Sequence, residues 1–225
     1  MAEWDALNAE IIACSRCPRL TVYREQVAQT RRAAFREQTY WGKPVPNFGA
    51  STARLLIVGL APAAHGGNRT GRIFTGDPSG AFLFDALYRT GFCNQPHATH
   101  CDDGLTLYDA AITAAVHCAP PDNKPTREEQ ESCFPYLVRA YRLMTHLRGF
   151  LALGQLAFEA CLRLAHQENL LPPDARYTFQ HGALYPLHHE KFLAVSYHPS
   201  ARNTYTKLLT MEMMTELLGR VRKRL

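Results

Sequence analysis

A run of apolar residues from Leu55 to Val58 leads directly into a glycine-rich loop that extends to Gly76. Asp77 and Pro78 then predict the start of a helix, because aspartate caps helix N-termini and proline suits the first helical position. The loop is longer than the roughly two to six residues that usually join a strand to a helix. The sequence therefore predicts an α/β protein whose first strand ends in a ligand-binding loop.

Near-continuous apolar runs recur along the chain and are typical of parallel strands that are covered on both faces. Helical patterns separate these runs, and strands that alternate with helices form a parallel sheet with right-handed crossovers. The prediction is a central parallel four-stranded sheet flanked by helices on both faces. The strands are expected at residues 54–60, 112–118, 150–153 and 192–197.

Two later helices carry clear signals. Thr126 and Glu129 form a capping box at the start of the first. Its buried face is expected to contain Cys133, Leu137, Ala140, Met144 and Leu147. The final helix repeats this spacing, and its apolar stripe is expected to contain Leu208, Met211, Met214, Leu218 and Val221. The basic tail at residues 220–224 is expected to be a solvated helix end.

The chain has 225 residues, of which 46% are hydrophobic, and this content is enough for a sizeable core. We expect a single domain over residues 1–225 that acts as a monomer. No apolar run approaches the ~20 residues that span a membrane, and the N-terminus lacks a signal-peptide pattern. We therefore expect a cytoplasmic protein with no membrane contact. The net charge of +5 is compatible with a polyanionic partner.

Three unusual loops each follow the carboxyl end of a predicted strand. They lie at residues 61–76, 119–125 and 198–202. In open α/β sheets, ligands bind at this edge of the sheet. The sequence therefore predicts that the three loops converge on one site although they lie far apart in the chain.

The seven cysteines are an odd number in a chain without a secretory signal, so metal-binding or core roles are favoured over a disulfide framework. Cys14 and Cys17 have the spacing at which two thiolates grip one metal centre. Spacing alone does not separate zinc from an iron–sulfur cluster, nor either from ordinary thiols. Cys93 and Cys101, in a polar loop that also contains His97 and His100, are an alternative pair. Cys161 is expected in the core.

Three motifs resemble those of the family 5 uracil-DNA glycosylases, the iron–sulfur type of bacteria and archaea, and the likeness covers nearly the whole chain. The first motif, Gly-Leu-Ala-Pro-Ala-Ala-His-Gly-Gly-Asn-Arg-Thr-Gly-Arg-Ile-Phe-Thr-Gly-Asp, spans residues 59–77 and is highly specific. The second, Cys-Ala-Pro-Pro-Asp-Asn-Lys-Pro-Thr, spans residues 118–126. The third, Ser-Tyr-His-Pro-Ser-Ala-Arg-Asn, spans residues 196–203. The segment Trp-Gly-Lys-Pro-Val-Pro-Asn-Phe-Gly at residues 41–49 also fits.

The resemblance implies a three-layer sandwich of the uracil-DNA glycosylase type and a 4Fe-4S cluster. The family binds its cluster through an N-terminal Cys-x2-Cys pair and two later cysteines about 15 residues apart. Here these ligands are Cys14, Cys17, Cys118 and Cys133. The cluster is expected to be structural and to tie the N-terminal helical segment to the sheet.

The implied reaction is hydrolysis of the bond that joins uracil to deoxyribose in DNA. Other deaminated bases, such as hypoxanthine and xanthine, are expected as further substrates. The base must be flipped out of the duplex first. The departing uracil gains negative charge, and a neutral histidine N–H aimed at its O2 atom would stabilise the transition state. His198 is the candidate for this role. Its alternative role is to cap the turn before Asn203.

Several residues are expected to contact the base. Phe74 is a candidate for stacking on it, with a core position as the alternative. Asn123 offers a donor and an acceptor to a pyrimidine edge, with an Asx turn before Pro125 as the alternative. Gly59, Ala61 and Ala63 are expected to keep the loop slim so that backbone amides approach the base or the attacking water.

The attacking water has no obvious partner, because residues 60–63 are apolar where other families of this superfamily carry a polar side chain. A dissociative path, with an oxocarbenium-like sugar, suits such a site. Asp77 is either the catalytic carboxylate that orients the water or a helix N-cap. No lysine lies in the core motifs, apart from Lys124, so the expected enzyme is monofunctional and does not cleave the strand.

DNA contacts of two kinds are expected. The loop with Ser200 and Arg202 suits a wedge in the minor groove. Phosphate contacts are expected from Arg69, Arg72, Arg202 and Lys207, and the basic tail is a further candidate. Two other functions remain open: a non-catalytic, metal-containing sensor of deaminated bases, and a zinc-stabilised enzyme that acts on small molecules.

Overall fold

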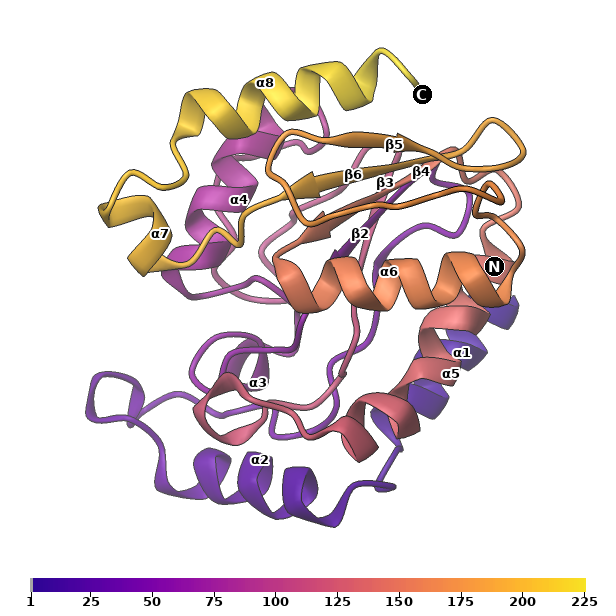
Figure 1. Ribbon diagram of the computed structural model, residues 1–225. Helices are drawn as coiled ribbons and strands as arrows, with labels where there is room; N and C mark the ends of the chain where they lie inside the picture. Colours follow the sequence, from indigo (N-terminus) through magenta and orange to yellow (C-terminus); the bar gives the residue numbers. More distant parts are fainter. Residues whose placement is uncertain (1) are drawn as a thin grey trace.

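A six-stranded sheet runs through the centre of the computed structural model, which describes residues 2–225 (Figure 1). Its middle is parallel, in the order β3-β2-β4-β6, and consists of β2 (Leu55–Gly59), β3 (Ala110–Ala114), β4 (Gly149–Leu153) and β6 (Phe192–Ser196). Short antiparallel strands close the edges, with β1 (Phe48–Gly49) against β3 and β5 (Leu184–Pro186) against β6. The four predicted parallel strands are confirmed, and the sheet gains two edge strands that were not predicted.

The strand predicted at residues 112–118 is misplaced. β3 ends at Ala114, which pairs with Gly59 at the end of β2. Beyond this point the Ala115 and Val116 N–H groups still donate to the carbonyls of Gly59 and Leu60, but the chain then leaves the sheet as a loop. Cys118 therefore lies in the β3–α5 connection and not at the end of a strand.

Helices cover both faces of the sheet, because alternate strand residues point to opposite sides. Leu56 and Val58 belong to the core beneath α1 (Ala2–Ile12), α5 (Arg127–Leu143) and α6 (Gln155–Gln167). Leu55 and Ile57 belong to the core beneath α4 (Pro78–Arg89) and α8 (Met211–Arg222). Figure 1 shows these two helical layers on opposite sides of the strands. The predicted three-layer α/β arrangement is confirmed.

The helix starts match their sequence signals. The Asp77 carboxylate accepts a hydrogen bond from the Gly80 backbone N–H at 2.9 Å, as an N-cap does. The Thr126 hydroxyl accepts from the Glu129 N–H, and the Glu129 carboxylate accepts from the Thr126 N–H. The predicted N-cap and capping box are therefore confirmed.

The apolar stripes predicted for the two later helices are observed, with two changes. Met144 and Leu147 are buried but lie beyond the end of α5. Leu208 is 48% exposed and lies before α8, which begins after its Thr210 cap. The neighbouring Leu209 is fully buried instead, so the apolar stripe of the last helix begins at Met211.

Short elements occupy the carboxyl edge of the parallel strands. The structure places α3 (Gly67–Thr70) after β2, η2 (Pro121–Asn123) after β3 and α7 (Ala201–Tyr205) after β6. Two N-terminal elements, α2 (Pro18–Thr30) and η1 (Ala33–Phe35), complete the fold, and α2 packs against α3. Between residues 2 and 225, no helix has both the length and the apolar character needed to cross a bilayer.

Candidate active site and cysteine pocket

The three unusual loops meet in one open pocket, which we call the base pocket, and their predicted convergence is confirmed. The β2–α4 loop and the start of α4 contribute most of its lining, the β3–α5 connection contributes one residue and the loop after β6 contributes two. The lining residues are Leu60, Ala61, Ala63, Phe74, Asp77, Pro78, Ser79, Asn123, His198 and Ser200.

His198 follows β6 and presents its imidazole to the base pocket. Its backbone carbonyl accepts a hydrogen bond from the Asn203 side-chain amide at 2.8 Å, whereas its ring makes no hydrogen bond to any residue between 2 and 225. The cap of α7 is Ser200, so the imidazole is free of the capping role. Burial lowers the pKa of His198. The ring is therefore neutral near pH 7 and keeps one N–H to donate.

Asp77 unites the two roles that the sequence left open. One carboxylate oxygen caps α4, yet the side chain also lines the base pocket. Burial raises the pKa of this carboxyl, while the N–H groups of Gly80 and Ser79 and the charge of Arg69 act in the opposite direction. The geometry thus places a desolvated carboxylate in the pocket and fixes it to the helix N-terminus.

Phe74 lies between the core and the base pocket. Its ring centre is 6.0 Å from that of His198, with a tilt of 35° between the planes. Only 7% of the residue is exposed, and its φ of 53° is unusual for a residue with a side chain. The ring therefore packs in the core and also reaches the wall of the base pocket.

Gly59 does not line the base pocket. It ends β2 and is buried beneath Phe74, where an added Cβ would lie 2.8 Å from the ring. Its missing side chain makes room for the Phe74 ring and does not open the loop to the base. Ala61 and Ala63 do line the base pocket, as predicted.

Asn123 lies in η2 with an exposed side chain and a left-handed backbone, with φ of 56°. Its backbone N–H donates to the Pro120 carbonyl at 3.2 Å. Its side-chain amide makes no hydrogen bond to the described residues, so the Asx-turn interpretation is not supported. The amide is therefore free to contact a ligand in the base pocket.

Arg69 and Arg72 are not on the surface, contrary to the prediction that they contact phosphates. Both are buried. Arg69 bonds to the carbonyls of His65 and Gly76, and Arg72 pairs with Asp103 at 2.7 Å. Their guanidinium groups thus hold the long loop in shape and are not free to meet DNA.

The loop after His198, which was predicted to contact DNA, lies at the base pocket. The Ser200 hydroxyl accepts from the Asn203 N–H at 3.3 Å and lines the base pocket. Arg202, in the first turn of α7, is exposed and forms no ion pair among residues 2–225. Ser200 and Arg202 are therefore accessible to DNA, whereas Arg69 and Arg72 are not.

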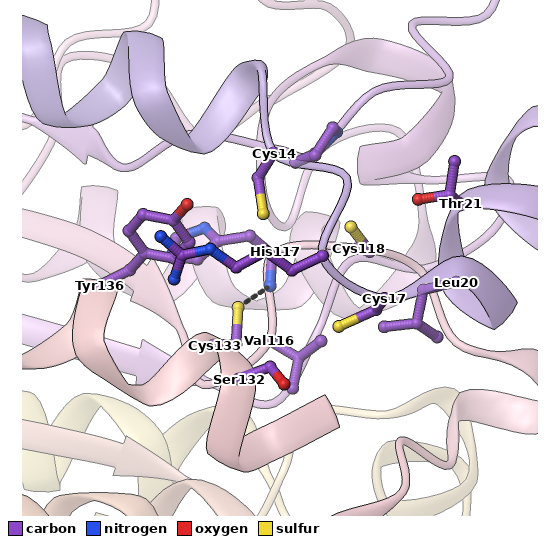
Figure 2. A pocket seen from close by; sticks show the side chains of 12 residues that line it. Cys14, Cys17, Leu20, Thr21, Val116, His117, Cys118, Ser132, Cys133 and Tyr136 are labelled. Carbon is purple, nitrogen blue, oxygen red and sulfur yellow. Dashed lines mark hydrogen bonds between the residues drawn. The ribbon is translucent and has the colours of Figure 1, made fainter. Parts of the chain in front are cut away.

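Four cysteines surround a second, mostly apolar pocket, which we call the cysteine pocket (Figure 2). Cys14 and Cys17 come from the α1–α2 connection, Cys118 from the β3–α5 connection and Cys133 from α5. Their sulfur atoms lie around a shared space (Figure 2). The fold therefore brings together the four residues that the family resemblance selected.

The spacing of the sulfurs bears on what they can hold. Four thiolates that bind one zinc ion at about 2.3 Å lie about 3.8 Å from one another. Within residues 2–225, the only three potential ligand atoms that all lie within 4.8 Å of one another belong to His100, Cys101 and Asp102. No three of the four cysteine sulfurs all lie within 4.8 Å of one another, so some of them are farther apart than the ligands of one zinc ion.

The surroundings of the cysteine pocket determine how readily its thiols lose their protons. Burial raises the pKa of Cys118 and of Cys133 to about 12, so bare thiolates are disfavoured there. Next to Cys118, the buried guanidinium of Arg24 has an Nε–H without a partner. The His117 backbone N–H also points to the Cys133 sulfur at 3.3 Å (Figure 2).

The other cysteines do not form a comparable site. Cys93 is buried and Cys161 lies in the core, as expected for Cys161. Cys101 is exposed beside His100 and Asp102. Neither residue of the alternative pair, Cys93 and Cys101, lines the cysteine pocket.

Two residues of these sites were missed in the sequence. An added Cβ on Gly66 would lie 2.0 Å from an Asp77 carboxylate oxygen, so this glycine makes room for the carboxylate. Arg24 gave no sequence signal beyond its place in α2, shortly after the Cys-x2-Cys pair. The burial of Arg24 depends on loops whose conformation the sequence does not predict.

Comparisons with known proteins place the chain in a family. The model of the uracil DNA glycosylase superfamily matches residues 46–222. The Type-5 uracil-DNA glycosylase of Thermus thermophilus is 46% identical over 95% of this chain and 94% of its own length. Those of Mycobacterium leprae and Pyrobaculum aerophilum are 45% and 42% identical, each over 96% of this chain, and 93% and 91% of their own lengths. The chain belongs to the uracil-DNA glycosylase superfamily and, within it, to the Type-5 proteins.

Proposed function

We propose that this protein hydrolyses the bond between uracil and deoxyribose in DNA and so starts base excision repair. The observation that carries the proposal is the meeting of His198, Asp77 and Asn123 in one open pocket. The shared family with proteins named Type-5 uracil-DNA glycosylase supports the choice of substrate.

His198 is the group that stabilises the departing base. As the bond to the sugar breaks, the uracil ring takes the electron pair and its O2 atom becomes negative. A neutral imidazole N–H in a partly buried pocket donates to that oxygen more strongly in the transition state than in the substrate. The lowered pKa of His198 keeps the ring in this neutral form.

Asn123 and Phe74 hold the base. The free Asn123 amide has one donor and one acceptor group for the polar edge of uracil. The Phe74 ring forms the wall on which the flipped base stacks. Flipping costs a few kcal/mol and is easier for a mispaired base, which favours uracil opposite guanine.

Asp77 is the carboxylate available to the sugar and the water. It lies in the base pocket with the apolar Ala61 and Ala63, and no other carboxylate lines this pocket within residues 2–225. Its negative charge stabilises an oxocarbenium-like sugar and orients the water that attacks it. The start of α4 holds the carboxylate in position for both tasks.

The enzyme is proposed to be monofunctional. No lysine is among the described residues that line the base pocket, so the pocket offers no amine for a Schiff base and strand cleavage. The lining is mostly small and apolar, which also suits other deaminated bases such as hypoxanthine and xanthine.

We also propose that Cys14, Cys17, Cys118 and Cys133 hold a 4Fe-4S cluster. The sulfur spacing supports a cluster over a zinc ion. The unpaired Arg24 Nε–H and the His117 N–H suit thiolate ligands of either group. When bound, the cluster supplies thiolate–iron bonds that join the α1–α2 connection to α5 and to the β3–α5 connection. Equal amounts of iron and acid-labile sulfide in the purified protein would support it, whereas zinc without sulfide would contradict it.

The test of the glycosylase is base release from a labelled duplex with one G·U pair. Strand breaks that appear only after alkali are expected, because a monofunctional enzyme leaves an intact abasic strand. Breaks without alkali would contradict the monofunctional mechanism. Tight binding without any base release would favour a sensor of deaminated bases, which the apolar segment at residues 60–63 also allows.

A further inference from the structure

Residues 31–38 form a loop, here called the arginine loop, that carries strong positive charge. Arg31, Arg32 and Arg36 are all exposed. None of them has a carboxylate within ion-pair distance in the part of the chain that the structure describes. Glu37 is the only acidic residue of this loop. The loop therefore presents three uncompensated guanidinium groups.

The arginine loop is fixed to the catalytic β2–α4 loop. The guanidinium of Arg69 lies 3.9 Å from the centre of the Phe35 ring and donates to the Gln38 side chain at 2.5 Å. Just beyond the loop, the Tyr40 hydroxyl meets the His65 Nδ1 at 3.0 Å. In Figure 1 the arginine loop projects from the end of α2 near α3. Its charges thus have a defined position relative to the catalytic residues.

A side pocket connects the arginine loop with the base pocket. Arg32 and Phe35 line it on one side, together with Tyr23 and His65. Ala63, Asp77, Pro78 and Asn123 line both this side pocket and the base pocket. Arg32 therefore lies near the entrance that a flipped nucleotide uses.

We propose that the side pocket binds a backbone phosphate of the DNA strand that carries the flipped nucleotide, through Arg32 and His65. A base in the base pocket stays attached to its sugar, and the sugar to two phosphates, so one phosphate must lie near the pocket entrance. Arg31 and Arg36, which are exposed on the same loop, add positive charge beside this site. The inference rests on the proposed function, because it takes DNA as the substrate.

The groups that face this site suit a phosphate. Burial and the charges of Arg32 and Arg69 lower the pKa of His65, so its ring is neutral when the site is empty of anions. With Nδ1 engaged by Tyr40, its Nε2–H is the free donor. Asp122 and Asp77 also line the side pocket; one Asp77 oxygen is engaged by the Gly80 N–H, and Asp122 is exposed to solvent.

The test compares Arg32→Gln with the wild type by fluorescence anisotropy, with a duplex that contains one stable abasic-site analogue. Binding is measured over a series of salt concentrations. One lost phosphate contact lowers the slope of log affinity against log salt by about 0.9 and weakens binding roughly fivefold at moderate salt. In single-turnover excision, Arg32→Gln is expected to need a higher enzyme concentration to reach the half-maximal rate. The maximal rate is expected to change less.

Arg142→Gln is the matched control. Arg142 is an exposed arginine near the end of α5, at the opposite edge of the sheet, and it pairs with Glu168. Its removal is expected to leave affinity and slope at the wild-type values. Arg32→Glu should weaken binding further than Arg32→Gln, because it adds a repulsive charge.

Wild-type affinity and slope in Arg32→Gln would overturn the proposal. Failure of the proposed function would give a different result. The wild type would then release no uracil, whatever the salt dependence of DNA binding by the arginine variants. The two proposals are therefore separable in one set of proteins.

Discussion

The base pocket and the cysteine pocket share the segment between β3 and α5, yet they present their functional groups in different ways. The base pocket leaves polar ends unpaired toward solvent, as in the His198 ring and the Asn123 amide. The cysteine pocket places its sulfurs in an apolar setting where thiolates are disfavoured. The first arrangement suits a ligand that comes and goes, and the second suits a group that stays.

This difference predicts which variants disturb folding and which disturb only chemistry. Cys118 and Asn123 are five residues apart on the same connection. The cysteine end of this segment lies beside Arg24 of α2 and Cys133 of α5, whereas the asparagine end has a left-handed backbone and an exposed side chain. Loss of the cysteine should therefore damage both pockets, and loss of a base-pocket side chain should damage one.

The largest effect is expected for Cys118→Ala. This change removes one of the four thiols, so iron content should fall to background and the melting temperature should drop or the protein should aggregate. Iron analysis and thermal unfolding measure the two effects. Cys101→Ala is the control, because Cys101 is exposed and outside the cysteine pocket. A Cys118→Ala protein with full iron content would remove this residue from the ligand set.

His198→Ala should have the next largest effect, and it should be confined to chemistry. Removal of one donor to a developing oxyanion typically slows a reaction about 10²–10³-fold. Single-turnover excision from the G·U duplex measures the rate, while iron content and melting temperature should match the wild type. A wild-type excision rate would exclude His198 from the mechanism and would break the contrast between the two pockets.

Local signals in the sequence were enough to predict much of this arrangement. The Asp77–Pro78 start, the Thr126–Glu129 capping box and the four parallel strands were all predicted from residues close together in the chain. The convergence of the three loops followed from the parallel sheet. The family motifs supplied the four cysteines, whose spacing alone left several alternatives open.

The errors concern contacts between distant residues. Arg69 and Arg72 were expected at the surface, yet each bonds to a side chain 31 positions away, Gln38 and Asp103 respectively. The end of β3 was misplaced because the apolar run continues to Val116, after the chain has left the regular strand. No pattern of nearby residues encodes such partners, so the free arginines of the arginine loop became visible only in the structure.

A smaller effect, on the retention of iron, is expected for Arg24→Met. This variant tests whether the buried guanidinium stabilises a group bound in the cysteine pocket. Removal of a group that supports metal ligands from outside typically costs about 10–100-fold in metal affinity. Without the buried guanidinium beside Cys118, the cluster loses a compensating positive charge and should release iron to a chelator faster. Iron release at equal protein concentration measures this effect, and Arg142→Met is the control. Release at the wild-type rate would show that Arg24 serves only to pack α2.

The smallest effect on stability is expected at Asp77, where the two roles can be separated. Asparagine caps helices about as well as aspartate, whereas replacement by alanine costs about 1 kcal/mol. Asp77→Asn should therefore keep α4 stable, and Asp77→Ala should lower the free energy of unfolding by about that amount. If the carboxylate charge supports the sugar and the water, both variants should excise uracil more slowly, to a similar extent.

The pH dependence of stability gives an independent reading of the same carboxyl. Its pKa is raised in the folded protein above the ordinary 3.8, because burial disfavours the charged form. The unfolded chain therefore releases this proton first as pH rises, so the wild type loses stability between pH 3.8 and the folded pKa, and the loss persists above it. Asp77→Asn lacks this titration, so its melting temperature relative to the wild type should increase across that window. A melting-temperature difference between Asp77→Asn and the wild type that stays constant with pH would show that the carboxylate is well solvated. The description of Asp77 as a desolvated carboxylate in the base pocket would then be wrong.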